Sequence, residues 1–378
     1  MEVKKSNLIL ISIFLVFIFS LFFVNLLTPD RTFSPIENRN LQQKPVFSWE
    51  KLFSGEFMQE YEAYVTDQFV LRDGWTALKA YSEKAIGKQE NNGVYICGDT
   101  LIERFDAGGG AQIESNLKAV DKFAGAAGVP VYLMLIPTAA DIWREKLPAG
   151  APGDDQAEII TVISQRTKAL TADAYGALMA HADEPVYYRT DHHWTSLGAC
   201  YGADALLEAM ELEGVRPDMW EKQTVSTTFY GTLYSSSGAR YVPPDSIDIY
   251  VPAEGIEVSS FEGGQWTDGE LYAMDRLQTK DQYSMFMGGN QPLAVVKTGR
   301  EGEKLLLIRD SYADSMVPFL TGAFSEIHMV DLRYYRQDMA GYIRENGIDR
   351  AAVVYSLKNF AEDKNVYFLG IGAREQDE

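Results

Sequence analysis

The first feature of the hydrophobic pattern is an almost unbroken apolar run from Leu8 to Leu27, preceded by two lysines. About twenty apolar residues in a helix span the hydrocarbon core of a bilayer. Because the lysines favour a cytoplasmic N-terminus, the pattern predicts a transmembrane signal anchor over residues 1–28 and an ectodomain outside the cytoplasm. A cleaved signal peptide is the alternative, although residues 25–27 (Asn-Leu-Leu) offer no small-residue cleavage site.

The next part of the chain, residues 29–92, changes from polar to amphipathic. Residues 29–50 are polar and punctuated by proline, which predicts an irregular connection. Apolar residues recur at helical spacing over residues 50–90, so we expect a helical segment to follow the connection. Beyond it, VYICGD and TLIERF predict a hairpin that turns at Gly98-Asp99.

From residue 112 onward, amphipathic helical patterns alternate with short apolar strands. The helical patterns are residues 112–128, residues 155–180, a segment capped by Thr195 or Ser196, and RQDMAGYIRENG. The strand patterns are VPVYLMLIP, PVYYRTDHHW, KLLLIRDS, SEIHMVD and DRAAVVYSL. Strands separated by helices form a mostly parallel sheet with helices on both faces. The sequence therefore predicts an α/β fold in which residues 93–378 form one domain, with a β-rich insertion at about 215–285.

Composition and charge narrow the classes of function. The 378 residues are 46% hydrophobic and carry 34 Lys and Arg against 54 Asp and Glu, a formal charge of −20. This composition excludes a disordered chain. It also argues against a nucleic-acid partner, because phosphate binding needs a concentrated cationic surface. Cys97 and Cys200 cannot form a disulfide framework or a zinc cluster; they are either one disulfide or two separate thiols.

Two of the four histidines are adjacent, in the stretch TDHHWT. In an extended segment residues two apart share a face, so we expect Asp191 and His193 to point together and His192 to point away. An aspartate fixes the tautomer of a neighbouring imidazole and stabilises its protonated form, as a general base requires. A purely structural hydrogen-bonded pair is the alternative. We expect no metal here, because adjacent strand residues diverge and no further ligand motif is present.

Ser311 is the candidate nucleophile that such a base would serve. It follows the apolar residues of KLLLIRDS, at the carboxyl end of a strand, where open α/β sheets bind ligands. The alternative is a serine that only caps the next helix. The backbone N–H of Ser311 and the amide of Asn290, which follows Gly288-Gly289, are candidate oxyanion donors, although Gly-Gly-Asn is also a common turn. Trp194 is either core packing or a platform for a sugar ring.

Taken together, these motifs resemble the DHHW family, bacterial surface proteins similar to the alginate O-acetylation proteins of the SGNH-hydrolase-like group. The resemblance spans most of the ectodomain and rests on ENRNLQQKP, DQFVLR, Gly87-Lys88, LIPTAADIWREKLP, TDHHWT, YSMFMGGNQPL and LLLIRDSYADSMVPFL. It implies an SGNH-hydrolase-like three-layer α/β/α fold. The chain order, with Asp and His before Ser, is similar to that of the alginate proteins and differs from ordinary SGNH esterases. His192 stands where the alginate proteins usually have a small hydroxyl residue.

Carried over motif by motif, the resemblance implies a role for each candidate residue. Ser311 would be the nucleophile, His193 the base and Asp191 the residue that orients the base. Asn290 and the Ser311 N–H would stabilise the oxyanion, while His192 and Trp194 would contact substrate.

The activity implied by the resemblance is O-acetyl transfer to a cell-surface or secreted polysaccharide, by a single-pass bacterial membrane protein with an extracellular ectodomain. A partner of the membrane-bound O-acyltransferase type would deliver the acyl group. No cofactor is expected, because the chemistry needs only a base and oxyanion donors. An acetyl esterase with the same triad remains open and differs only in the acceptor. A non-catalytic carbohydrate-binding or assembly protein, which would tolerate loss of Ser311, also remains open.

Overall fold

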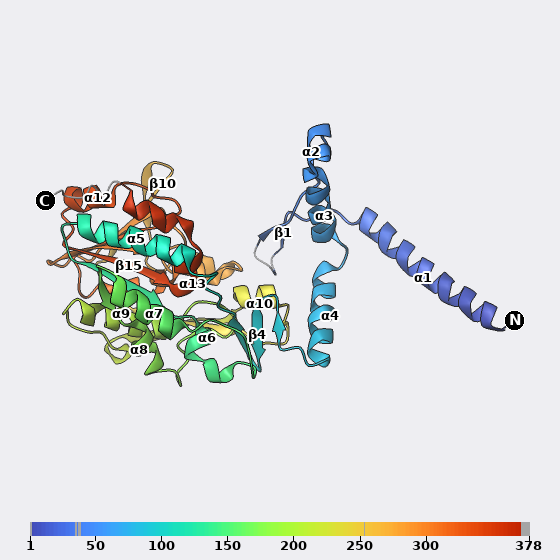
Figure 1. The fold of residues 1–378 in the computed structure, drawn as a ribbon, viewed down its shortest axis with the longest axis horizontal. Helices are drawn as coiled ribbons and strands as arrows, with labels where there is room; N and C mark the ends of the chain where they lie inside the picture. Colours follow the sequence, from blue (N-terminus) through green and yellow to red (C-terminus); the bar gives the residue numbers. More distant parts are fainter. Residues whose placement is uncertain (1, 35, 37–38, 253, 372–378) are drawn as a thin grey trace. The chain divides into compact units, whose positions relative to one another are not determined.

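The computed structural model describes residues 2–34, 36, 39–252 and 254–371. Its contacts divide the chain into two compact units (Figure 1). The first comprises Met1–Lys88 with Gly238–Arg240, and the second comprises Gln89–Ser237 with Tyr241–Glu378.

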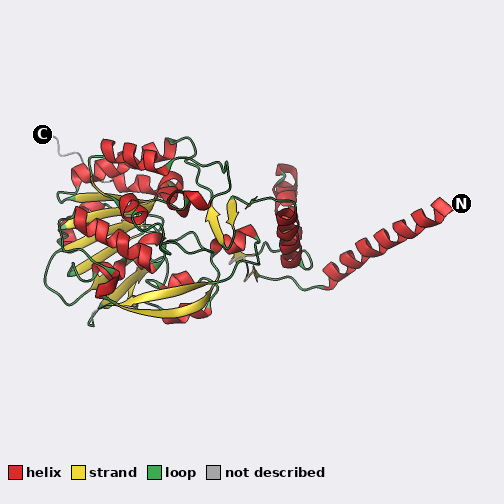
Figure 2. Ribbon diagram, turned by 90° about the horizontal axis from the view of Figure 1, so that it is seen from below, coloured by secondary structure: helices red, strands yellow, loops and turns green. Residues whose placement is uncertain are grey.

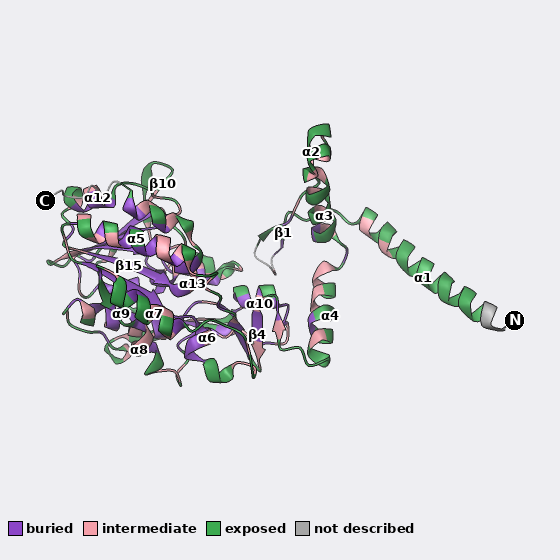
Figure 3. Cartoon of the chain, viewed as in Figure 1, coloured by how far each residue is buried: buried purple, intermediate pink, exposed green. Residues whose placement is uncertain are grey.

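The first unit begins with a long apolar helix, α1 (Glu2–Leu27). Within it, Lys5–Leu27 is long and apolar enough to cross a membrane, with a mean hydropathy of 2.8 and no buried residues, as the mostly green helix in Figure 3 shows. The other elements of this unit are β1 (Phe33–Ser34), β2 (Arg39–Asn40), α2 (Trp49–Ser54), α3 (Glu56–Gln68) and α4 (Arg72–Ala85).

The helical pattern predicted over residues 50–90 is divided into three helices by two left-handed residues. Gly55, with φ +83°, ends α2 and begins α3. Leu71, with φ +55°, precedes α4. A left-handed residue cannot continue a right-handed helix, so the chain changes direction at each of these positions.

The second unit contains a large eight-stranded sheet with the order β11-β10-β12-β14-β13-β15-β6-β7. The last five strands in this order are parallel to one another, and β11, β10 and β12 continue the sheet in antiparallel pairing. The strands are β6 (Val131–Ile136), β7 (Leu170–Ala172), β10 (Glu257–Glu262), β11 (Gln265–Gly269), β12 (Leu293–Lys297), β13 (Lys304–Arg309), β14 (Glu326–Val330) and β15 (Arg350–Ser356).

Both faces of this sheet are covered, which produces three layers. Successive side chains of a strand point to opposite faces, and in β13 Leu305 and Leu307 pack into one apolar cluster whereas Leu306 and Ile308 pack into the other. The second cluster contains residues of α5 (Ala111–Ala126), α12 (Met339–Asn346) and α13 (Leu357–Glu362). The first contains residues of α8 (Ala174–Met179), α9 (Ser196–Ala209) and α11 (Val317–Leu320). Figure 2 shows the yellow strands of the sheet with red helices packed around them, and Figure 3 shows the buried strands in purple. The predicted three-layer α/β/α fold is confirmed.

The helices of this unit agree with the predicted alternation, apart from one segment. They are α5 (Ala111–Ala126), α6 (Ala139–Ile142), α7 (Gln156–Arg166), α8 (Ala174–Met179), α9 (Ser196–Ala209), α10 (Thr232–Ser237), α11 (Val317–Leu320), α12 (Met339–Asn346) and α13 (Leu357–Glu362). The single helix predicted over residues 155–180 is wrong. Helix α7 ends where Thr167 is extended, and α8 begins where the Asp173 side chain accepts a hydrogen bond from the Gly176 N–H at 2.8 Å.

Two small sheets complete the fold. Strands β3 (Glu90–Asn91), β4 (Val94–Cys97) and β5 (Thr100–Glu103) form an antiparallel meander that turns at Gly98, as the hairpin pattern predicts. Strands β8 (Glu221–Phe229) and β9 (Asp245–Val251) pair with each other. The other strands from the β-rich region, β10 and β11, join the edge of the large sheet instead.

Both cysteine thiols are free in the structure. Burial raises the pKa of Cys97 to about 11 and that of Cys200 to about 12. At neutral pH both therefore remain protonated thiols, which are poor nucleophiles.

Candidate active site

Ser311 lies immediately beyond the carboxyl end of the buried strand β13, at the first position of the 3-10 helix η5 (Ser311–Ser315). Asp310 fixes this turn. One of its carboxylate oxygens accepts a hydrogen bond from the Tyr312 N–H at 3.0 Å. The other accepts from the Ser356 N–H and from the Asn359 side chain, both at 2.8 Å. The turn is thereby held against the neighbouring strand β15, and the half-buried Ser311 remains accessible.

The TDHHWT stretch forms a bend instead of the predicted strand. A single β-bridge joins Tyr187 to Trp194, and the residues between them turn back on themselves. Asp191 stabilises the bend by accepting a hydrogen bond from the His193 N–H at 3.0 Å, a local side-chain contact that competes with extended structure.

The bend and the serine turn meet in a continuous line of hydrogen bonds. The Nδ1 of His193 lies 2.6 Å from Oδ1 of Asp191, and its Nε2 lies 2.8 Å from Oγ of Ser311. A carboxylate can only accept, so Nδ1 carries the proton and Nε2 is the acceptor for the serine hydroxyl. Three residues predicted from two separate motifs are therefore brought together in the arrangement that activates a serine.

Asp191 is anchored on its second oxygen as well. Its Oδ2 accepts hydrogen bonds from the Thr232 N–H at 2.8 Å and from the Thr232 hydroxyl at 3.0 Å. The chain approaches so closely that a Cβ on Gly231 would lie 2.2 Å from the Asp191 Cβ. Glycine is therefore required at position 231 for this contact.

The electrostatic environment keeps the base neutral and the carboxylate charged. Burial lowers the pKa of His193 to about 4, and the neighbouring His192 adds to this effect, whereas Asp191 opposes it. Burial tends to raise the pKa of Asp191, but His192, His193 and Thr232 together hold it well below its usual range. At neutral pH His193 is thus ready to accept a proton.

The position of His192 corrects the prediction that it points away. Its ring lies beside that of His193, with centroids 3.9 Å apart, because the segment bends where an extended strand would have separated them. The His192 Nδ1 lies 2.7 Å from the hydroxyl of Thr232. The ligand atoms of Asp191, His192 and His193 lie within 4.8 Å of one another, so the divergence on which we based the expectation of no metal does not occur. Within the described residues these atoms form hydrogen bonds: His193 bonds to Asp191, and His192 bonds to Thr232.

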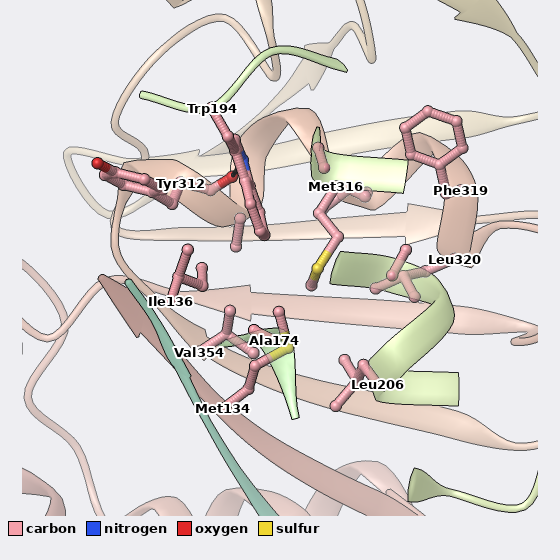
Figure 4. Packing of buried hydrophobic residues seen from close by; sticks show 14 of the residues in the cluster. Met134, Ile136, Ala174, Trp194, Leu206, Tyr312, Met316, Phe319, Leu320 and Val354 are labelled. Atoms are coloured by element: carbon pink, nitrogen blue, oxygen red, sulfur yellow. Dashed lines mark hydrogen bonds between the residues drawn. The ribbon is translucent and has the colours of Figure 1, made fainter. Parts of the chain in front are cut away.

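Trp194 is a second correction. Its side chain has 0% exposure and packs among Met134, Met316 and Leu206 in the core (Figure 4). The indole N–H donates to the carbonyl of Tyr312 at 2.9 Å. A fully covered ring offers no platform for a sugar, so the prediction that Trp194 contacts substrate is wrong. Trp194 instead supports the serine turn through its hydrogen bond to Tyr312.

The structure adds Tyr283, which the sequence analysis did not single out. Its ring lies parallel to the His193 imidazole at 3.8 Å, and its hydroxyl donates to the carbonyl of Ser311 at 3.1 Å. Tyr283 is the first residue of the YSMFMGGNQPL motif, seven residues before Asn290. Its place in that motif is the sequence signal that could have identified it as a site residue.

The loop that ends at Asn290 has an unusual backbone. Met287, Gly288 and Gly289 all have positive φ, at +58°, +73° and +99°, and Met287 is a buried non-glycine residue. Such conformations are costly and persist where the surroundings impose them. Asn290 itself is exposed, and its side-chain oxygen accepts a hydrogen bond from Arg333 Nη2 at 2.9 Å.

Comparison with known proteins identifies the family of this chain. No curated protein sequence was found to match the chain. Among solved structures, a DHHW family protein of Eubacterium siraeum has 25% identity and a TM-score of 0.64, covering 74% of this chain and 95% of its own. PatB1 of Bacillus cereus, solved with a sulfonyl adduct, has 20% identity and a TM-score of 0.59, covering 73% and 97%.

The O-acetyltransferase domain of Pseudomonas putida AlgJ has 15% identity and a TM-score of 0.45, covering 72% of this chain and 96% of its own. A likeness this distant carries no argument about chemistry. The model of the DHHW family, described as DHHW protein, matches residues 84–330, which is more than half of the chain. The protein therefore belongs to the DHHW family.

Proposed function

We propose that this protein is an extracytoplasmic O-acetyltransferase that acts on a surface or secreted polysaccharide through an acyl-enzyme on Ser311. The observation that carries the proposal is the Asp191–His193–Ser311 line of hydrogen bonds, at 2.6 and 2.8 Å, at the carboxyl edge of a parallel sheet. Membership of the DHHW family, together with the sequence motifs that resemble those of the alginate O-acetylation proteins, supports transfer of an acetyl group in particular.

The first half-reaction forms the acyl-enzyme. His193 Nε2 removes the proton from the Ser311 hydroxyl as Oγ attacks the carbonyl carbon of an acetyl ester. The resulting tetrahedral oxyanion would be stabilised by the Ser311 N–H, which has no acceptor within its own helix turn, and by the Asn290 amide. Collapse expels the donor alcohol, which takes the proton from His193, and leaves acetyl on Ser311.

The second half-reaction transfers the group. A sugar hydroxyl gives its proton to His193 and attacks the acetyl carbonyl, and the released Ser311 oxygen recovers that proton. If water enters in place of the sugar, the same steps hydrolyse the ester, so the acceptor alone separates transferase from esterase.

We further assign residues 1–28 to a cytoplasmic tip and signal anchor, 29–92 to a connection and helical segment, and 93–378 to the catalytic domain. A membrane-spanning α1 would tether the chain to the membrane, in which a membrane-bound O-acyltransferase-type partner could supply the acyl group. No step above requires a cofactor.

The test compares the ectodomain from residue 30 onward with its Ser311→Ala, His193→Ala and Asp191→Asn variants. Hydrolysis of 4-nitrophenyl acetate is followed with and without an oligosaccharide acceptor, which is analysed by mass spectrometry. We expect the native ectodomain to release 4-nitrophenol and to acetylate the sugar, and all three variants to lose both activities. Release of 4-nitrophenol by the native ectodomain without acetylated sugar would indicate an esterase. Equal background release from four folded proteins would leave only a binding or assembly role.

A further inference from the structure

The contact between Arg333 and Asn290 determines which way the asparagine amide faces. A guanidinium group has five N–H donors and no acceptor. Because Arg333 Nη2 lies 2.9 Å from the Asn290 side chain, the amide atom that faces Arg333 must be the oxygen. The amide nitrogen of Asn290, with its two N–H groups, is therefore directed away from Arg333.

Arg333 is itself held in place by Asp331. The Nε of Arg333 lies 3.0 and 3.1 Å from the two carboxylate oxygens, and its Nη2 lies 2.6 Å from Oδ2. The Arg333 backbone N–H also donates to Asp331 at 3.0 Å. A two-pronged pair of this kind fixes the plane of the guanidinium as well as its position, which a lysine could not do.

A buried arginine lies beside Asp331. Asp331 and Arg309 are each 1% exposed, and Arg309 Nη1 lies 3.9 Å from Asp331 and 3.1 Å from Asp314. Asp314 belongs to the η5 turn that begins at Ser311. Alternating acidic and basic side chains thus connect the nucleophile turn with the Asn290 loop.

Strand register places this chain at the edge of the sheet where Ser311 lies. Leu293 of β12 pairs with Val330 of β14, and Val330 pairs with Ile308 of β13. Asn290 precedes Leu293 by three residues, and Ser311 follows Ile308 by three, so both extend beyond the same edge. The loop of Asn290 also reaches the serine turn through the hydrogen bond from Tyr283 to the Ser311 carbonyl.

We propose that Arg333 is a positioning residue that orients Asn290 so that its amide N–H groups, and never its oxygen, face the developing oxyanion. This inference rests on the proposed function, because it assigns Arg333 a task only if Ser311 attacks an ester. A free amide would present its oxygen to the oxyanion in part of the molecules, and those molecules would repel the charge instead of stabilising it. Arg333 acts through Asn290 and need not touch the substrate.

The experiment is a double-mutant cycle on the full-length protein with 4-nitrophenyl acetate as the probe. Arg333→Met, Asn290→Ala and the double variant are compared for kcat and KM. Loss of one oxyanion donor typically costs about 10²- to 10³-fold in kcat. We expect Asn290→Ala to approach this loss and Arg333→Met to lose about tenfold or more, each with KM nearly unchanged. The double variant is expected to match Asn290→Ala, because Arg333 has nothing left to orient.

Two further variants isolate the orientation effect. Arg333→Lys can still donate to the Asn290 oxygen and is expected to recover part of the lost kcat. Arg166→Met is the control, since Arg166, in the last turn of α7, donates instead to Glu114 at 2.8 Å; its kcat is expected to equal that of the native protein. If Arg333→Met fails to fold, the same loss is expected for Arg333→Gln. A glutamine amide can either donate to or accept from the Asn290 amide, so it does not select one orientation of Asn290.

The outcomes separate this inference from the proposed function. Retained kcat in a folded Arg333→Met, alongside an inactive Ser311→Ala, overturns the role of Arg333 and leaves the serine chemistry standing. Additive losses in the double variant overturn it as well. Full activity of Ser311→Ala contradicts the proposed function, and the role of Arg333 falls with it.

Discussion

The ring of Tyr283 lies parallel to the imidazole of His193, with 8° between the planes and 3.8 Å between the centroids. Tyr283 is 5% exposed, so this stacked pair is shielded from water. The imidazole is thereby held between an aromatic face and the hydrogen bonds to Asp191 and Ser311. An imidazole that is already fixed by these contacts loses little conformational entropy when it accepts a proton, which is the advantage of a preorganised site.

Replacing Tyr283 separates the stacking from the hydrogen bond. Tyr283→Phe removes the bond to the Ser311 carbonyl and should cost about 1 kcal/mol of unfolding free energy with a small loss of kcat. Tyr283→Ala removes the ring, which should cost about 3–5 kcal/mol and release His193. Thermal unfolding and ester hydrolysis measure both effects. Tyr272→Phe is the control, because the Tyr272 hydroxyl donates to the Tyr250 carbonyl and not to the serine turn. Equal kcat for Tyr283→Ala and the native protein would show that Tyr283 does not position His193.

The pH profile should report the repulsion between the two histidines. His193 is active when neutral, and its pKa is lowered to about 4 first by burial and then by His192. The acid limb of kcat/KM should therefore fall near pH 4, and His192→Gln should move it upward, because one source of the lowering is removed. His181→Gln, which removes a histidine paired with Glu184, should leave the limb unchanged.

The same lowering has a consequence for stability. A histidine whose pKa is lowered by folding contributes stability above its unfolded pKa of about 6.5, and this stability is lost as the pH falls through the folded value. Denaturant unfolding between pH 7 and 4 should show a smaller loss in His192→Gln than in native protein. An acid limb of the kcat/KM profile that stays in place or moves to lower pH in His192→Gln would show that His192 does not lower the pKa of His193.

Gly231 should not tolerate even one added methyl group. In Gly231→Ala the new Cβ would lie 2.3 Å from Asp191 Oδ2, so the carboxylate must move and its bonds to Thr232 must break. Overpacking of this kind costs about 1–3 kcal/mol, and kcat should fall as His193 loses its orientation. Gly125→Ala in helix α5, where nothing lies within 4 Å, should be neutral or stabilising. Unchanged activity of Gly231→Ala would mean that the close approach is not needed.

The N-terminal helix should behave as an uncleaved anchor. Full-length protein is expected in the membrane fraction after alkaline extraction, whereas a chain lacking residues 1–28 should be soluble, because α1 is the helix within the described residues that is long and apolar enough to span. The measurement is the mass of the N-terminal peptide from cells. A mature chain that begins after the apolar run would establish a cleaved signal peptide instead.

Much of the fold could be predicted because apolar periodicity is a local signal. The strands β6, β13, β14 and β15 are short and mostly apolar, as buried strands are, and the helices between them favour parallel pairing. The position of Ser311 at a strand's carboxyl end, and the spacing of Asp191 and His193, likewise depend on few neighbouring residues.

The remainder depends on contacts between distant segments. The bend at TDHHWT is stabilised by Asp191 and by Thr232, forty-one residues later in the chain, so local spacing misplaced His192. The burial of Trp194 requires Gly202, where a Cβ would lie 2.5 Å from the indole ring, and that proximity is visible only in the folded helix α9. Arg333 reaches the site from a separate segment with no motif of its own. Tyr283 lies in the YSMFMGGNQPL motif, but its contact with His193 forms only in the folded chain.

The most direct test of the central claim is to look for the acyl-enzyme itself. The ectodomain is mixed with 4-nitrophenyl acetate, quenched rapidly in acid and digested, and the peptide that contains Ser311 is examined by mass spectrometry. We expect the mass of one added acetyl group on Ser311 in the native protein, and none in Ser311→Ala or His193→Ala. Ester turnover by the native protein with no acetyl on Ser311, or with equal acetylation in His193→Ala, would contradict it.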